Sequence, residues 1–575
     1  MNVRRRWSAL LTCAMLLAAC GGPPTAGTSP TASTGSAASS AASSAASAAS
    51  DTPVSGGSII VGTPQEPASL NPLLASATIE DAVGSLFTEG LVQVDATGVF
   101  APVLAEELPA VSEDGLTVTY KLKRGVTFSN GDPFTCADVQ YTREAILSDL
   151  SQVSTSGYSA IDAIDCPDEH TAVVRFGKLY APYLRLFSYI LPRAAGDVKQ
   201  LDTWAFNRAP IGTGPWLLKE WKSGDSLALA RNPAYREQGK PYLDAVNIKI
   251  LPSREVGVQL LGTGEIDVLW DLTEADFPTL KALEAQGVGY AAAVTGENEL
   301  LVLNLADPAV DAPPDAAQSP HPILNDLRVR QAMQQGIDRQ SIAAALLYGN
   351  VQPGSTLLPV GQFACPGATV AYDPEAAKAL LEQAGWQAGA DGIRVKDGRR
   401  MELKIQTTSG NKLREDTQQV LVEQMKALGI ALRIENVPSD VLFAGWGDNG
   451  LRKHGRFDIV LYTTGPGIDP DSHLFANYHS ASIPTAENTG DGSNYSRYRN
   501  ATVDQELEKA AATTDLAARK EAYCRANAQI LTDLPRIPLY ERLSLSGYRT
   551  RIQNFKVSPG PSDFTVGSES WWLKP

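Results

Sequence analysis

The stretch MELKIQTTSGNKLREDTQQVLVEQMKALGIALRIENV (401–437) decides the fold class of this chain. Its first eight residues alternate in polarity as a strand does, and a helix-like pattern follows from Asn411 to Leu428. Gly429 stands where the glycine that ends a helix belongs. Residues 430–437 then alternate again. A strand, a helix and a second strand in this order predict a βαβ-type layer.

Patterns on both sides of this stretch extend the same interpretation. FDIVLY (457–462) is typical of a further strand, and DPEAAKALLEQAG (373–385) carries a capping Asp, a Pro at the first helical position and a closing Gly. Residues 326–347 have helical spacing with a break near their middle. The alternation in 117–123 and 171–176 favours antiparallel pairing with one buried face. We therefore expect an α/β protein with an antiparallel part and no internal repeat.

Composition and charge exclude several classes of protein. The chain has 575 residues, of which 43% are hydrophobic and 20% charged, as is ordinary for a soluble globular protein. Its 49 Lys and Arg against 64 Asp and Glu give a net charge of −15. Nucleic-acid binders need clustered positive charge, so we expect no nucleic-acid partner. A chain of this size buries enough surface to fold without a metal or disulfides.

The N-terminus has the pattern of an export signal. Residues 1–20, MNVRRRWSALLTCAMLLAAC, place three Arg before a short apolar run. The run ends in Leu-Ala-Ala-Cys, similar to the lipobox of bacterial lipoproteins, which predicts lipid attachment at Cys20. An ordinary signal peptide with an incidental Cys, or a short membrane anchor, is the alternative. Residues 21–56 are rich in Ala and Ser and predict a flexible tether. No later segment is apolar for long enough to span a bilayer.

The sequence lacks the usual signatures of catalysis and metal binding. It contains no G-x-S-x-G, H-E-x-x-H or G-x-x-x-x-G-K-[ST] motif, and its five His are scattered. We therefore expect no enzyme, no cofactor and no metal site. Four Cys remain after the leader, without a C-x-x-C pair, and they allow three disulfide pairings or free buried thiols. These four are Cys136, Cys166, Cys365 and Cys524.

A series of blocks in a fixed order resembles one family of bacterial proteins. The blocks include SLNPLLASATIEDAVGSLFTEGLV (69–92), FSNGDPFTCADVQYT (128–142), DLRVRQAMQQGIDRQSI (326–342) and FDIVLYTTGPGIDPDSHL (457–474). Together they are similar to the extracellular solute-binding proteins of family 5, the peptide/nickel-type receptors of ABC importers. The resemblance runs from about residue 57 to the C-terminus, which is nearly the whole chain after the tether.

The resemblance implies a two-lobed periplasmic-binding-protein-like fold of type II, in its three-domain cluster C form, with a ligand cleft between the lobes. Lobe 1 would combine residues 57–98, 208–303 and 533–575 with an inserted domain at 99–207, and lobe 2 would hold residues 304–532. Under this layout the disulfides favoured are Cys136–Cys166 and Cys365–Cys524, because the other pairings would bridge the hinge.

The function implied is capture of a peptide or similar small polar solute and its delivery to an ABC permease. The receptor would be a monomer, lipid-anchored on the outer face of the cytoplasmic membrane. A sensory lipoprotein that signals to a membrane partner, or binding of a nickel chelate, a sugar or an opine-like solute, is the alternative. A secreted hydrolase is a third class, for which no nucleophile motif is present.

Peptide-binding members carry an Asp shortly before the block written here GIDPD, and it pairs with the ammonium group of the ligand. Here Gly465 and Pro466 stand at that place, so another group must take this role if a peptide binds. The residues that we predict to contact ligand follow from this block and from aromatic or acidic side chains expected near the cleft. They are Trp270, Asp271, Asn304, Trp446, Tyr462, Thr463, Thr464, Gly465 and Asp469.

Overall fold

A computed structural model describes residues 52–368, 370–560 and 563–574. The chain divides into two units, Met1–Asp51 and Thr52–Pro575, and only the second contains described residues. The predicted signal peptide, the lipid attachment at Cys20 and most of the predicted tether therefore lie outside the described residues. No helix in the described part of the chain combines the length and the apolar character needed to cross a membrane.

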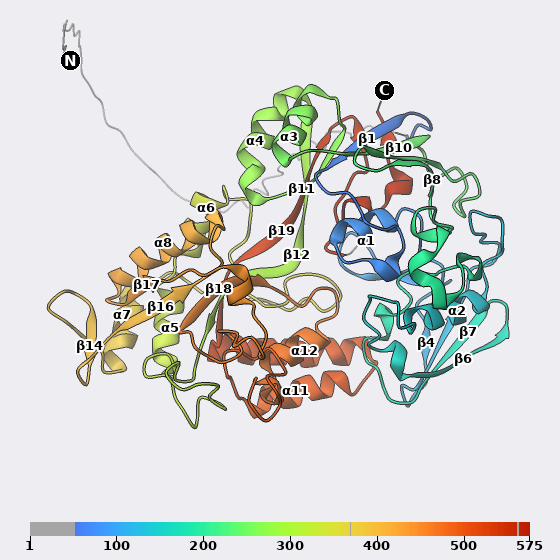
Figure 1. Ribbon diagram of the computed structural model, residues 1–575. Coiled ribbons are helices and arrows are strands. Elements are labelled where there is room, and N and C mark those ends of the chain that lie inside the picture. The colour runs from blue at the N-terminus through green and yellow to red at the C-terminus, as the bar shows by residue number, and fades with distance from the viewer. Residues whose placement is uncertain (1–51, 369, 561–562, 575) are drawn as a thin grey trace, which may run out of the picture. The chain divides into compact units, whose positions relative to one another are not determined.

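A ten-stranded mixed sheet is the framework of the folded unit (Figure 1). Parallel pairs join β16 to β17 and to β18, and β1 to β10 and to β11, whereas the remaining neighbours are antiparallel. In spatial order the strands are β17 (Ala431–Ile434), β16 (Glu402–Gln406), β18 (Ile459–Thr464), β12 (Val288–Leu303), β19 (Arg536–Arg549), β11 (Val268–Leu272), β1 (Ser58–Thr63), β10 (Ala245–Ile250), β9 (Ser226–Arg231) and β8 (Trp216–Lys222).

Two long strands, β12 and β19, join the two lobes of this unit. Figure 1 shows them crossing from the part that holds β1, β8 and β10 to the part that holds β16, β17 and β18. Their register shifts at two places near the middle, and the larger shift is the first: Val294 faces Leu543, but the next paired residue of β12, Asn298, faces Glu541. The three residues between them form a bulge opposite Arg542. A bulge bends a strand and increases its local twist, so the sheet changes direction here.

Local sequence signals explain the helices that cover the second part of the sheet. The predicted break in residues 326–347 is confirmed, because α5 (Leu327–Gln335) ends and α6 (Arg339–Leu346) begins after a cap by Asp338. Asp373 caps α7 (Pro374–Gln383) as predicted. The helix predicted between the two strands of the opening stretch is α8 (Lys412–Ala427). The other helices on this side are α9 (Ser439–Leu442), α10 (Asp471–Tyr478), α11 (Ala501–Ala511) and α12 (Leu516–Asp533).

The strand β18 is buried on both of its faces. Ile459 and Leu461 join one hydrophobic core, and Val460 and Tyr462 join another. Burial of both faces is typical of a strand inside a sheet that is covered on both sides.

The first part of the sheet is accompanied by α1 (Thr78–Gly84), α3 (Arg254–Thr263) and α4 (Phe277–Leu283).

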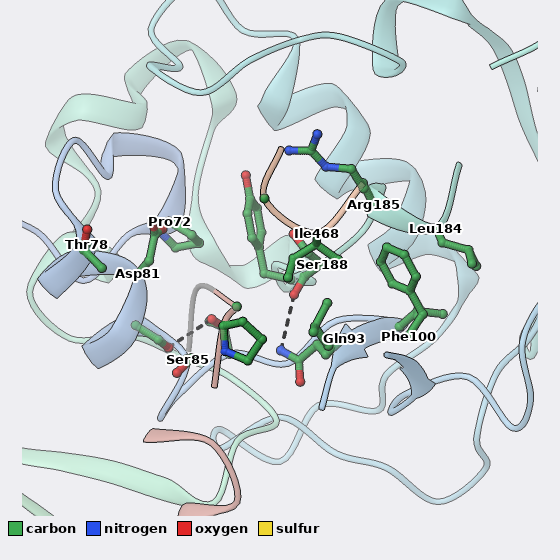
Figure 2. A pocket seen from close by; sticks show the side chains of 18 of the residues that line it. Pro72, Thr78, Asp81, Ser85, Gln93, Phe100, Leu184, Arg185, Ser188 and Ile468 are labelled. Atoms are coloured by element: carbon green, nitrogen blue, oxygen red, sulfur yellow. Dashed lines mark hydrogen bonds between the residues drawn. The ribbon is translucent and has the colours of Figure 1, made fainter. Parts of the chain in front are cut away.

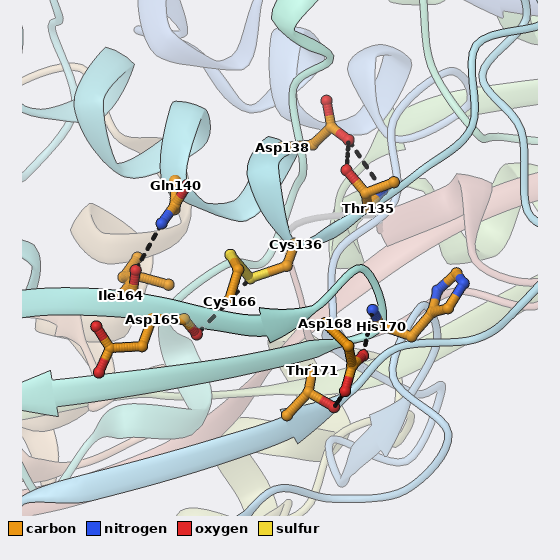
Figure 3. The surroundings of a disulfide bond; sticks show 10 residues. All are labelled: Thr135, Cys136, Asp138, Gln140, Ile164, Asp165, Cys166, Asp168, His170 and Thr171. Carbon is orange, nitrogen blue, oxygen red and sulfur yellow. Dashed lines mark hydrogen bonds between the residues drawn. A yellow bond between two sulfur atoms is a disulfide. The ribbon is translucent and has the colours of Figure 1, made fainter.

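A separate antiparallel sheet lies within residues 110–176, where alternation predicted it. Its order is β4 (Ala110–Val111), β5 (Thr117–Lys121), β7 (Thr171–Phe176) and β6 (Ile161–Asp168). The helix α2 (Cys136–Ile146) packs on it, and the disulfide Cys136–Cys166 ties α2 to β6 (Figure 3). A second disulfide joins Cys365 to Cys524 in α12. These are the two pairs that the domain layout favours.

Short strands form the remaining small sheets. The hairpin of β2 (Val92–Val94) and β3 (Phe100–Pro102) follows α1 in the chain. The other small sheets consist of β13 (Gln387–Ala388), β14 (Arg394–Lys396) and β15 (Arg399–Arg400), and of β20 (Ile552–Gln553) and β21 (Trp572–Leu573).

Candidate functional site

A cavity of about 500 Å³ lies where α1, the β2–β3 hairpin and the loop after β18 meet. This volume is within the usual range for small-molecule sites. Figure 2 shows side chains reaching into it from several elements, among them Asp81 of α1, Ser85 directly after α1, Gln93 of β2 and Arg185. Residues 466–468, which directly follow β18, line the cavity from the other lobe, on the far side of the strand crossing formed by β12 and β19. The cavity is therefore bordered by segments from both lobes.

Two adjacent acids of α1 have opposite environments. Glu80 is buried, and its carboxylate accepts hydrogen bonds from the backbone N–H groups of Ala68 (3.0 Å) and Ala77 (2.9 Å), so it closes the first turn of the helix. Asp81 opens into the cavity, and no described residue donates a hydrogen bond to its carboxylate or forms an ion pair with it. Partial desolvation there, with a smaller effect of the Glu80 charge, raises the pKa of Asp81 to about 6.

The cation of the cavity is Arg185, the last residue of the short 3-10 helix Tyr183–Arg185. Its side chain is exposed, and among the described residues none pairs with its guanidinium. Arg185 and Asp81 are the two charged side chains of the described cavity lining. Every other polar group there is neutral, including the Tyr189 phenol, whose pKa is raised well above its usual value chiefly by burial.

A buried ionic network holds the strand crossing together. Arg542, opposite the bulge of β12, donates to both carboxylate oxygens of Glu274 (2.8 and 3.1 Å) and to Glu299 (3.1 Å). Arg414 of α8 donates to the other oxygen of Glu299 at 2.9 Å. The side chains of Glu274 and Glu299 are 1% and 0% exposed. Each buried carboxylate therefore has a cation, which a buried charge needs to be tolerated.

Thr463, predicted to contact ligand, is the centre of that network. Its hydroxyl donates to Glu299 at 2.6 Å and accepts from Arg414 at 3.0 Å and from Arg542 at 2.8 Å. One donated and two accepted hydrogen bonds are the full capacity of a hydroxyl group. Thr463 therefore has no capacity left for a ligand while this network is formed.

Thr464 and Gly465, the next two residues of the predicted site, lie against β12. Thr464 is half-buried and faces Asn298 across the β12–β18 pair. Gly465 lies against the bulge, where an added Cβ would stand 2.4 Å from the carbonyl oxygen of Gly296. The chain therefore needs glycine at position 465 because of a close backbone approach.

Asp469 is buried one residue beyond the cavity wall. Its carboxylate forms a two-pronged ion pair with Arg519 of α12, at 2.8 and 2.9 Å, and both side chains are 1% exposed. Arg519 also donates to the carbonyl oxygen of Ala181 at 3.0 Å. Because Ala181 precedes the 3-10 helix that ends at Arg185, this pair connects the loop after β18 to the segment that carries the cation of the cavity.

Trp270 and Asp271 lie within β11, also outside the cavity lining. The Trp270 indole N–H donates to Asp563 at 2.7 Å, and the ring packs on Phe564 with centroids 5.5 Å apart. Asp271 has a left-handed backbone (φ 64°) and an ion pair with Arg254 at 3.6 Å. Burial raises the pKa of the Asp271 carboxyl, although the Arg254 charge opposes this effect.

The three remaining predicted residues pack inside the second lobe. Asn304 is fully buried, and its amide donates to two backbone carbonyls, at 2.9 and 2.8 Å. Tyr462 is 5% exposed and lies near Arg452, whose guanidinium stands 5.3 Å from its ring centroid. Trp446 stacks on His454 at 4.2 Å. None of the predicted ligand residues lines the cavity, and ligand contact by them stays a prediction.

Sequence reasoning missed the two charges that the cavity does contain. Asp81 is in the quoted block SATIEDAVGSLF, directly after the acid that the helix start uses for capping. Adjacent residues of a helix lie on different faces, so an acid directly after the capping acid cannot share its role. This was the available signal that Asp81 is left for another function. Arg185 follows an irregular segment and had no such signal. Among the described residues, no group of three His, Cys, Asp or Glu side chains is arranged to hold a metal ion.

Comparisons with known proteins agree on one family. The profile of the bacterial extracellular solute-binding proteins, family 5 Middle, matches residues 99–484. Protein XP55 of Streptomyces lividans is 29% identical over 484 residues, covering 83% of this chain and 82% of its own. The oligopeptide-binding protein AppA of Bacillus subtilis is 26% identical over 586 residues, covering 98% of each chain.

A solved structure shares the fold. The crystal structure of NikZ from Campylobacter jejuni in complex with Ni(L-His) superposes with a TM-score of 0.66 and 24% identity, over 90% of this chain and 99% of that one. This likeness supports the two-lobed periplasmic-binding-protein-like fold.

Proposed function

The chain belongs to the bacterial extracellular solute-binding proteins of family 5, and from this premise we propose that it captures an oligopeptide or a similar small polar solute and delivers it to the permease of an ABC importer. Its relatives include a protein that binds oligopeptides, and its structural neighbours include one solved with a nickel–histidine complex. Relatives in this family are substrate-binding proteins, and we extend this to the present chain: it makes and breaks no bond.

The observation that supports this function is the position of the cavity. Its walls come from α1 and the β2–β3 hairpin on one side of the crossing and from residues 466–468 on the other. Within the large sheet, the neighbouring strands β12 and β19 pass between the two parts (Figure 1). Rotation at the bulge would open and close the cavity, as hinged binding domains do around a ligand. The domain layout proposed above, with lobe 2 at residues 304–532, is consistent with such a motion.

We further propose that the receptor is a lipid-anchored monomer on the outer face of the cytoplasmic membrane. The lipid would be attached at Cys20, and residues 21–56 would be the tether to the folded unit. Substitution of Cys20 by Ser tests the anchor, because it should move the protein from the membrane fraction to the soluble extracytoplasmic fraction. Mass spectrometry of the wild-type N-terminus should show the added lipid, and an unlipidated membrane-bound protein would contradict this proposal.

A deletion strain tests the transport function. We expect it to lose uptake of the solute that stabilises the purified full chain in a thermal-shift screen, since a ligand that binds the native state raises Tm by mass action. Re-expression of the wild-type chain is the control. Intact uptake combined with loss of gene induction would instead assign a sensory role. Recovery of a chemically altered solute would assign an enzymatic one.

A further inference from the structure

We propose that the solute is a zwitterion whose ammonium group binds the carboxylate of Asp81 and whose carboxylate binds the guanidinium of Arg185. This inference rests on the proposed function and names the ligand chemistry of the same cavity. It also assigns the acid that is missing at Gly465–Pro466 to the opposite wall, on α1.

The charge inventory of the cavity carries the argument. Asp81 and Arg185 are the charged side chains among the described lining residues, and they have opposite signs. Residues 466–468, the loop after β18 that also lines the cavity, are Pro-Gly-Ile and carry no charge. A ligand with one net charge would leave either the acid or the cation unpaired when the lobes close and exclude water. That arrangement is costly, so the cavity favours a ligand that carries both charges.

Neither charge is used by the fold. The neighbouring Glu80 closes the first turn of α1 with its own set of backbone hydrogen bonds, so Asp81 is not needed there. No described residue lies within ion-pair distance of Arg185, and its backbone N–H donates to the carbonyl oxygen of Pro182 within the same short helix. A free guanidinium offers two parallel N–H donors, which match the two oxygens of a carboxylate.

Neutral polar groups line the same cavity as the two charges. Figure 2 shows Ser85, Gln93 and Ser188 among them. The Gln93 amide already donates to the carbonyl oxygen of Ser188 at 3.4 Å. Leu184 and Phe100 add apolar surface to the same cavity. Backbone amides of a short peptide, between its charged ends, match this mixture of hydrogen-bonding and apolar groups.

The environment of Asp81 adds a pH dependence. Its pKa is about 6. The titratable groups that act on it or that it acts on are Glu80 on its own helix and Tyr189, and Arg185 is the other charged residue of the cavity lining. At pH 7.5 the carboxylate is ionised and attracts an ammonium group. Below pH 6 it is protonated and this attraction is lost. Capture of an ammonium-bearing solute should therefore weaken as the pH falls from 7.5 to 5.

Calorimetric titration of the purified full chain with trialanine, N-acetyl-trialanine and trialanine amide tests the inference at pH 7.5. We expect trialanine to bind, and capping of either end to weaken binding about 10- to 100-fold, as loss of a charged hydrogen-bonded pair does. Asp81→Asn should weaken trialanine by a similar factor and leave the N-acetyl peptide unchanged. Arg185→Gln should weaken trialanine and leave the amide unchanged. The wild-type Kd should rise toward pH 5, and that of Asp81→Asn should not.

Matched controls are Asp149→Asn and Arg124→Gln, which change exposed charges outside the cavity and should leave every affinity as it is. The capped peptides need no variant, so they remain informative if a variant fails to fold. Equal binding of capped and free peptides overturns the inference. The inference is also overturned if a sugar or a nickel–histidine complex stabilises the protein while free amino acids and alanine peptides do not. The proposed receptor function would then still stand. Undiminished solute uptake in the deletion strain would instead contradict the proposed function.

Discussion

The strand crossing and the cavity differ in whether their charged side chains have partners of opposite charge. At the crossing, Glu274 and Glu299 are almost completely buried, and Arg542 and Arg414 pair with them. In the cavity, Asp81 has no partner among the described residues, although the protein around it raises its pKa. Buried charges without partners are costly to a fold, so those at the crossing are paired.

The difference separates charges that stabilise the fold from charges left for a ligand. A charged side chain that lines a cavity and has no partner costs little while water reaches it, and it is available when a ligand replaces that water. A perturbed pKa in a cleft is therefore a better indication of a binding site than one inside a complete ion-pair network. This distinction can be tested by removing charges of each kind.

Replacing Arg542 by Met should have the largest effect on stability. The substitution leaves Glu274 without a cation and Glu299 with one instead of two. Breaking a buried pair costs about 3–5 kcal/mol, and urea unfolding should show this as a lower midpoint. The matched control is Arg185→Met, which removes an exposed, unpaired cation and should change the free energy of unfolding by less than about 0.5 kcal/mol. Equal losses in the two variants would contradict the comparison.

Thr463→Val should cost less, about 1–3 kcal/mol, because it keeps the shape of the side chain but removes the hydroxyl at the centre of the network. Two guanidinium groups and one carboxylate each lose a partner. Thr464→Val, beside it on β18, is the control. If Thr463 contacts ligand instead, the substitution should weaken ligand binding with little change in the unfolding midpoint, and the network interpretation would be wrong.

Gly465→Ala tests the backbone contact at the bulge. The added methyl group would stand 2.4 Å from the carbonyl oxygen of Gly296 and 2.6 Å from the Cα atom of Glu297. We expect a loss of about 1–3 kcal/mol, as for other overpacked sites, read from thermal unfolding. Gly447→Ala meets no atom within 4 Å and should be tolerated. An unaltered Tm for Gly465→Ala would mean that the two strands separate freely there.

Asp81→Asn should give the smallest change, and its sign depends on pH. The pKa of Asp81 is raised to about 6 in the fold, above its ordinary value, so the folded state binds its proton more tightly than the unfolded state does. This group therefore lowers stability as the pH rises from about 4 to 6. The ligand-free variant should be more stable than wild type at pH 7.5, on the order of 1 kcal/mol because the carboxylate faces solvent, and equal to it near pH 4. A variant that is less stable at pH 7.5 would assign Asp81 a hidden partner.

Much of the fold could be predicted from local sequence. The ends of α7 and α8 and the break between α5 and α6 were predicted from a capping Asp, from helical spacing and from glycines, which act within a few residues of themselves. The alternating runs likewise predicted β5, β7 and β16. The disulfide pairs were favoured only after the family layout placed each Cys in a lobe.

The candidate site was predicted less well, because its members are distant in sequence. The block around Gly465 was chosen for its similarity to ligand-binding segments, yet Thr463 and Asp469 pair with Arg414 and Arg519 from other helices. No pattern within one segment predicts such pairs, because the two partners are far apart in the sequence. The same holds for Asp81, whose neighbour Glu80 has the same chemistry but a structural role.

The sequence by itself therefore determined the family, the α/β class, the ends of several helices and the absence of known catalytic motifs, because these depend on short-range periodicity and on the order of blocks. Only the tertiary structure decided which charges are free. Pairing depends on distances of a few ångströms between segments that are far apart in the chain, such as Glu274 and Arg542, or Asp469 and Arg519. The order of residues does not state those distances, and packing sets them.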